Sequence, residues 1–170
     1  ARKKLGLTRQ AKAPAEGSVS LDLAVGDQEF QRCLECNSVC NKCVEVCPNR
    51  ANIALRVEAA GLRNYYQIIH LDAYCNECGN CATFCPWDGK PYSDKITLFS
   101  GERDFIESTN PGFWLDGNRL HVRHDGLIRV FDLPDDRITI PNSDLNLALM
   151  AEIFNLLHAK RPALFGPVEE

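Results

Sequence analysis

All nine cysteines of this 170-residue chain lie between Cys33 and Cys85, in two runs that each end in a cysteine followed by a proline. The first run reads CLECNSVCNKCVEVCP, and the second, after a 26-residue spacer, reads CNECGNCATFCP. Moving the second run back by 38 positions places Cys78, Cys81, Cys85 and Pro86 on Cys40, Cys43, Cys47 and Pro48. The chain therefore contains an internal repeat of a cysteine pattern, and this repeat constrains its fold more than any other feature.

The distribution of the cysteines favours metal ligation over a disulfide scaffold. A secreted disulfide scaffold spreads its cysteines through a short chain and carries a secretory signal. Here the cysteines are odd in number, they occupy 53 residues, and the last 85 residues contain none. No apolar stretch follows the basic start of the sequence, so we expect no signal peptide and a reducing, cytoplasmic location.

Composition narrows the range of partners. The formal net charge is −4, and no dense basic face is visible outside the short N-terminal arm, which argues against a nucleic-acid partner. No run approaches the ~18 apolar residues that a membrane-spanning helix needs. The polar opening suggests that the chain is the end part of a longer polypeptide.

The sequence divides into three parts. We expect a linker or N-terminal arm over residues 1–26, a cluster-bearing domain over 27–100, and a small α+β appendage over 101–170. A short helix is expected over residues 27–32. The predicted fold class is α+β, with a ferredoxin-like two-cluster domain followed by the appendage.

Local patterns predict the elements of these parts. Alternating β-branched segments around a turn at Gly61 and Asn64 predict a hairpin between the cysteine runs, and residues 95–99 predict a further strand. In the appendage we expect strands over 114–122 and 127–133, joined by a turn at residues 124–126. Apolar residues at helical spacing predict a helix over 144–158, capped by Asn142 or Ser143 and stopped before Pro162.

The second run has the spacing of an iron–sulfur ligand set. Its C-x2-C-x2-C-x3-C-P pattern, from Cys75 to Pro86, is the bacterial run that holds [4Fe–4S] clusters. Gly79 lies where the loop has to approach the cluster closely and where a positive φ is expected. A zinc ribbon would use two C-x2-C pairs and leave several cysteines unused.

The first run departs from this pattern at one position. The residue expected as its leading ligand is Asn37, and the nearest cysteine is Cys36, one residue earlier, with Cys33 three residues before that. One additional loop residue is easily accommodated, so Cys36 is the predicted ligand and Cys33 the alternative. The cysteine left over is a buried apolar residue or a spare thiol.

The two runs resemble a bacterial-type 2[4Fe–4S] ferredoxin domain. The strings RCLECNSVCNKCVEVCPNRANI and HLDAYCNECGNCATFCPWDGKPYSDKITLF are similar to the C-terminal region of the selenate reductase/glutamate-synthase-small-subunit-like iron–sulfur flavoproteins. The resemblance implies two [4Fe–4S] clusters, with FAD and NAD(P)H sites on an upstream region or a partner chain. Matching residues assigns Cys36, Cys40, Cys43 and Cys85 to one cluster, and Cys47, Cys75, Cys78 and Cys81 to the other.

The resulting hypothesis is an electron-transfer module with no catalytic residue of its own. Its partner would be a flavoprotein domain or another redox protein, and Val39, Val46, Ile53 and Phe84 are the apolar residues expected to shield the clusters. One alternative is a zinc-binding interaction module that docks a partner through the C-terminal helix. Another is a catalytic iron–sulfur enzyme that uses Cys33 or an open iron.

Overall fold

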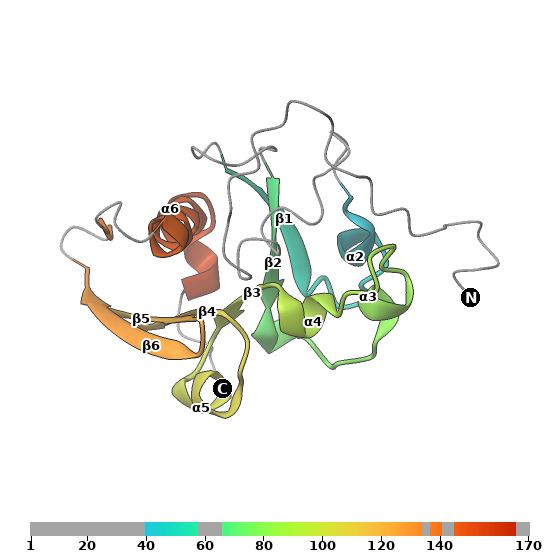
Figure 1. The fold of residues 1–170 in the computed structure, drawn as a ribbon, viewed down its shortest axis with the longest axis horizontal. Helices are drawn as coiled ribbons and strands as arrows, with labels where there is room; N and C mark the ends of the chain where they lie inside the picture. Colours follow the sequence, from blue (N-terminus) through green and yellow to red (C-terminus); the bar gives the residue numbers. More distant parts are fainter. Residues whose placement is uncertain (1–39, 58–65, 134–136, 141–144, 166–170) are drawn as a thin grey trace.

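The framework of the molecule is one six-stranded mixed sheet whose strands are neighbours in chain order (Figure 1). The computed structural model describes residues 40–57, 66–133, 137–140 and 145–165. Strands β2–β3 and β3–β4 pair in parallel, and the remaining neighbours pair antiparallel. The strands are β1 Asn52–Arg56, β2 Tyr66–Leu71, β3 Ile96–Phe99, β4 Gly112–Asp116, β5 Arg119–His124 and β6 Leu127–Asp132.

Short helices occupy the connections of this sheet. Because parallel neighbours need a crossover connection, the chain leaves the sheet between β2 and β3, and the second cysteine run lies in that crossover. The first described helix, α2 (Lys42–Glu45), precedes β1. The crossover contains η2 (Asp72–Tyr74), α3 (Asn80–Thr83) and α4 (Pro91–Asp94), and the next connection contains α5 (Glu102–Glu107).

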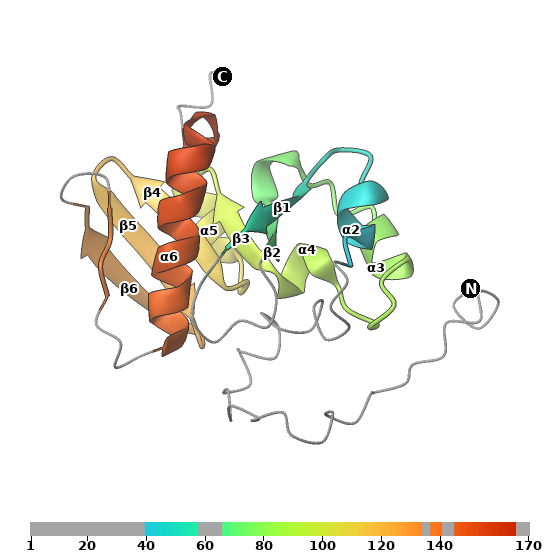
Figure 2. The same cartoon turned by 90° about the horizontal axis from the view of Figure 1, so that it is seen from above.

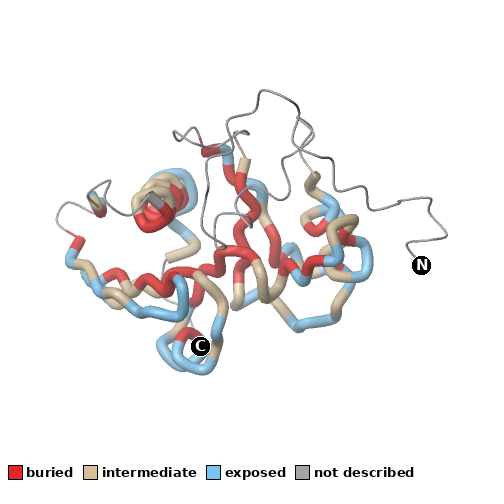
Figure 3. Tube along the Cα trace, viewed as in Figure 1, coloured by how far each residue is buried: buried red, intermediate tan, exposed pale blue. Residues whose placement is uncertain are grey.

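Helix α6 (Leu145–Lys160) covers one face of the sheet, and α5 lies on the other (Figures 1 and 2). Side chains along β4 alternate between these faces, as expected for a strand. The Phe113 ring lies 5.8 Å from the Phe154 ring of α6, whereas the Trp114 ring lies 6.0 Å from Phe105 of α5. The main core therefore lies between the sheet and α6, where the buried segments meet (Figure 3).

Several expected elements are confirmed. The hairpin between the cysteine runs is present as β1 and β2, the strand at residues 95–99 as β3, and the C-terminal helix as α6. Asp125 and Gly126 both have positive φ, 50° and 72°, so the tight turn between β5 and β6 is also confirmed. The expected helix over 27–32, the hairpin turn and the N-cap of the last helix lie outside the described residues.

Two expectations are wrong. The strand expected over 114–122 is a hairpin, because the chain turns at Gly117, whose φ of 55° is easily reached by glycine. The expected ferredoxin-like two-cluster domain with a separate appendage is overturned by the sheet itself. Parallel pairing of β3 with β4 joins strands on both sides of residue 100 into one sheet.

The described part of the chain contains no helix that is both long enough and apolar enough to cross a membrane.

Candidate metal centre

The two cysteine runs fold alike where both are described. Each forms one turn of helix, α2 in the first run and α3 in the second, and the two helices lie side by side (Figures 1 and 2). A turn at the Cys-Pro pair follows, closed by hydrogen bonds from Arg50 N to Cys47 O and from Asp88 N to Cys85 O, both 3.4 Å. Arg50 and Asp88 have left-handed φ of 58° and 59°. The 38-residue repeat of the sequence is thus a repeat of backbone structure.

The loop before α3 confirms the expectation for Gly79. Its φ is 79°, in the left-handed region, and it forms the N-terminal boundary of the helix. Glu77, between Cys75 and Cys78, is also left-handed with a φ of 50°. These two residues turn the backbone tightly between successive cysteines, so that the loop curves around a hollow.

That hollow is lined by cysteines from both runs. Its walls include asparagine, glycine and Tyr92 as well as the thiols. The cysteines that line it are Cys47, Cys75, Cys78 and Cys81. Cys47, from the first run, therefore lies with three cysteines of the second run.

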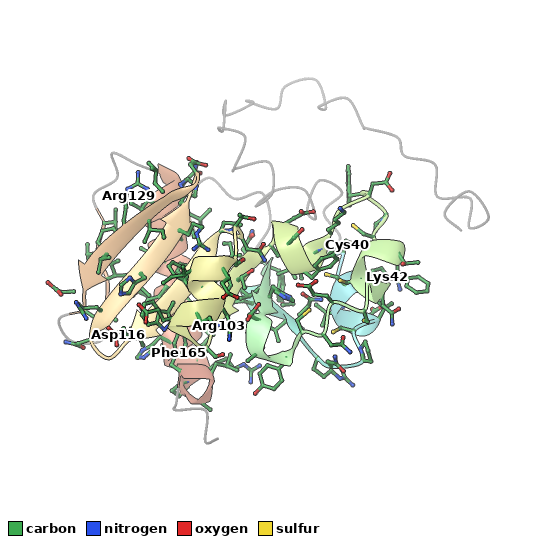
Figure 4. All side chains as sticks on the ribbon, turned by 90° about the horizontal axis from the view of Figure 1, so that it is seen from below. Cys40, Lys42, Arg103, Asp116, Arg129 and Phe165 are labelled. Carbon is green, nitrogen blue, oxygen red and sulfur yellow. The ribbon has the colours of Figure 1, made fainter. Side chains whose placement is uncertain are left out.

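The cysteines assigned to the other cluster lie around the paired helices. Cys43 is buried against Ile68 of β2, where it meets Cys81 of the hollow, and Cys85 is also buried. Cys40 is half-buried and lies at the same end of the molecule as Lys42 (Figure 4). Cys33 and Cys36 lie outside the described residues, so the choice between them stays a prediction.

Backbone amides point at the sulfurs of the hollow. Ala51 N–H donates to Cys47 Sγ at 3.2 Å, and Glu77 N–H donates to Cys75 Sγ at 3.3 Å. Hydrogen bonds of this kind stabilise negative charge on sulfur and tune the potential of a bound iron–sulfur cluster.

Burial raises the pKa of the Cys75 and Cys81 thiols. The backbone N–H of Glu77 opposes the effect at Cys75, and those of Tyr92 and Ala82 oppose it at Cys81. Negative charge on Cys47 raises both pKa values further, which indicates that these sulfurs lie within electrostatic range of one another. Cationic metal would replace the protons, so metal binding here releases protons.

The arrangement of the thiols around the hollow does not suit a single metal ion. In the described ranges, no group of three or more Cys, His, Asp or Glu side chains is arranged to hold one metal ion. A cubane has an iron at each of four separated corners, so its four thiolates lie farther apart than those around one zinc. Four thiols around one hollow, with amides directed at two of them, match the ligand chemistry of such a group.

The apolar residues expected to shield the clusters differ in their burial and in what they pack against. Phe84 is 48% exposed, and Ile53 packs against the main core on the α6 side of the sheet. Val46 is half-buried, and Val39 lies outside the described residues. The side chains that do pack against the buried cysteines are Ile68, Val44 and Tyr92. Sequence reasoning missed Ile68 because strand β2 approaches the cysteines only through the tertiary fold.

A buried polar pair beside the cysteines was also missed. Asn52 is 2% exposed and His70 is 1% exposed, and they are opposite one another in the β1–β2 ladder. The distance from Asn52 Oδ1 to His70 Nδ1 is 2.9 Å. The only sequence signal is an asparagine and a histidine in otherwise apolar strands.

Comparison with known proteins relates the chain to redox proteins. It is 47% identical over 161 residues, 91% of its length, to the protein named "Putative oxidoreductase YgfK" of Escherichia coli strain K12. The protein of the same name from Escherichia coli O157:H7 matches to the same extent. This similarity supports an oxidoreductase-related family. The chain spans 15% of the length of these curated relatives. No family model matches the chain, and no solved structure matches it.

Proposed function

We propose that this chain is an electron-transfer module that binds two [4Fe–4S] clusters and relays single electrons within a larger oxidoreductase. The observation that carries the proposal is the hollow lined by Cys47, Cys75, Cys78 and Cys81. Three of these cysteines come from the regular run, and the fourth comes from the other run. This exchange of the last cysteine is typical of two-cluster sites.

The chain's own residues would hold the clusters and control their surroundings. Cys47, Cys75, Cys78 and Cys81 would ligate one cluster, and Cys36, Cys40, Cys43 and Cys85 the other, with Cys33 as the alternative to Cys36. A bound cluster supplies one-electron chemistry. The buried side chain of Ile68, together with the partly buried Val44 and Tyr92, excludes water from the inner side of the site.

The electron donor and acceptor would lie on other parts of the enzyme. The similarity covers a small part of an oxidoreductase-named protein, and the sequence resembles the cluster-bearing end of iron–sulfur flavoproteins. We therefore propose that a flavoprotein region with FAD and NAD(P)H sites exchanges electrons with this chain. No step of substrate chemistry is assigned to the chain's own side chains.

The test is a metal and sulfide count after anaerobic reconstitution with iron and sulfide. We expect about eight irons and as many sulfides per chain, with visible absorption that bleaches reversibly on reduction. Colourless protein that holds only zinc would contradict the proposal and favour the zinc-binding interaction module. A Cys47→Ser variant should disturb one cluster, while a Ser108→Ala variant on the α5 side of the sheet should keep the native count.

A further inference from the structure

The side chain of Asn52 connects the two cysteine runs. It lies at the start of β1, where its Nδ2 is 3.1 Å from the backbone oxygen of Cys43 in the first run. It also lines the same hollow as Cys81 of the second run. One buried amide therefore lies between the two runs, at the point where α2 and α3 lie side by side.

His70 fixes the orientation of this amide. The Cys43 oxygen can only accept a hydrogen bond, so the NH2 group of Asn52 has to face it. The amide oxygen then faces His70 Nδ1 at 2.9 Å, and that nitrogen has to carry the hydrogen. Reversing the amide would place two acceptors together at Cys43, and the His70 ring would have to carry its hydrogen on Nε2 instead.

We propose that Asn52, oriented by His70, is a positioning residue that raises the reduction potential of the cluster held by Cys81. This inference rests on the proposed function. A reduced cluster carries more negative charge than an oxidised one, and much of that charge lies on sulfur. An N–H donor in the wall of the hollow beside Cys81 therefore stabilises the reduced state more than the oxidised state.

The surroundings strengthen this effect. Asn52 and His70 are almost completely buried, so water cannot take the place of the amide when it is removed. Burial also lowers the pKa of His70 to about 4, so the ring is neutral at neutral pH and adds no charge beside the cluster. The amide dipole is then the main polar group that this pair contributes.

The test is a redox titration of the reconstituted protein, followed by electron paramagnetic resonance. In Asn52→Leu, which keeps the size and removes the donor, we expect one of the two potentials to fall. The expected change in the reduction equilibrium constant is roughly threefold to tenfold, the latter being about 59 mV for a one-electron couple. The potential of the other cluster should stay at its native value.

Variants at His70 provide an independent measurement. His70→Phe should lower the same potential by less than Asn52→Leu does, because the amide loses only its orienting partner. His70→Gln can still donate to Asn52 Oδ1 and should restore most of the native potential. The control is Asn155→Ala, which removes another bridging amide, bonded to Ile138 N and Ile138 O at 3.0 and 2.8 Å but distant in the fold from the cysteines. It should lower stability and leave both potentials unchanged.

The outcomes separate this inference from the proposed function. Native potentials in Asn52→Leu, with the full iron content, would overturn the role of the amide. If Asn52→Leu binds less iron, unchanged potentials in His70→Phe would overturn it instead. A wild-type chain that binds no iron–sulfur cluster would contradict the proposed function, and the inference with it.

Discussion

The sheet under α6 and the cysteine-bearing turns differ in how much apolar surface they bury. Among the described residues, the cluster between the sheet and α6 contains seventeen buried side chains. The corresponding cluster at the cysteine-bearing end contains three, Cys43, Ile68 and Cys81. Burial of apolar surface can stabilise the first region, whereas the second has too little of it. We therefore expect the cysteine-bearing turns to depend on ligation by metal, as small metal-binding units generally do.

Removal of the metal should produce the largest difference in stability between the two regions. In iron-free protein we expect the turns at residues 40–50 and 75–90 to lose protection from amide hydrogen exchange, because their few apolar contacts do not hold them. Helix α6 and strands β4 and β5 should stay protected by the main core. Hydrogen exchange of loaded and iron-free protein measures both regions at once. Equal protection of the cysteine-bearing turns in both samples would show that they do not need the metal.

A cavity made in the main core tests whether buried apolar surface stabilises the region between the sheet and α6. Phe154 is fully buried and packs on Phe113, so Phe154→Ala should lower the free energy of unfolding by about 3–5 kcal/mol. Denaturant unfolding of the reconstituted protein measures this loss. The matched control is Ile106→Ala on α5, where the side chain is 61% exposed and the expected change is within about 0.5 kcal/mol. Similar losses in both variants would contradict the placement of the core.

Acid should lower the free energy of unfolding through His70, which lies between the two regions. Burial lowers the pKa of His70 to about 4 from 6.5, so the unfolded chain binds a proton on this residue at a higher pH than the folded chain does. His70 therefore lowers stability as the pH falls from about 6.5 to about 4, by roughly 3 kcal/mol in all, and has no such effect above that range. The difference in unfolding free energy between the wild type and His70→Gln, measured across this range, isolates the contribution. A difference that does not change with pH would contradict it.

The smallest effect is expected at an exposed ion pair outside both clusters. Arg103 and Glu107 of α5 form a 3.0 Å ion pair, with 85% and 63% of the side chains exposed (Figure 4 labels Arg103). Arg103→Ala should lower stability by no more than about 0.5 kcal/mol, because water and salt screen such a pair. Thermal unfolding in low and high salt is a suitable measurement. A loss above about 1 kcal/mol would show that α5 depends on more than its buried side chains.

Local features of the fold could be read from the sequence. The alternation around residues 52–57 and 66–71 predicts the hairpin, and the 38-residue offset corresponds to two backbone segments of the same shape. Gly79 has the positive φ that its loop position demands. These features depend on residues close together in the chain, which is why pattern and spacing are sufficient.

The long-range pairing could not be read in the same way. Parallel alignment of β3 with β4 depends on how α5 returns the chain to the sheet, and no local pattern encodes that register. At Gly112 of β4 an added Cβ would lie 2.0 Å from the Thr97 oxygen, so this close approach requires glycine, yet the sequence shows only one glycine among eleven. The position of Asn52 between the two cysteine runs was missed for the same reason, since it depends on the packing of α2 and α3 against β1 and β2.

Reductive titration of the reconstituted wild-type chain, followed by electron paramagnetic resonance, tests the central claim most directly. Two [4Fe–4S] clusters held side by side should give about two unpaired spins per chain on full reduction, with line splitting from their mutual coupling. The signal should disappear on reoxidation and return on a second reduction without loss of iron. Protein that holds zinc alone, or iron that cannot be reduced and reoxidised, would contradict the assignment of electron transfer to this chain.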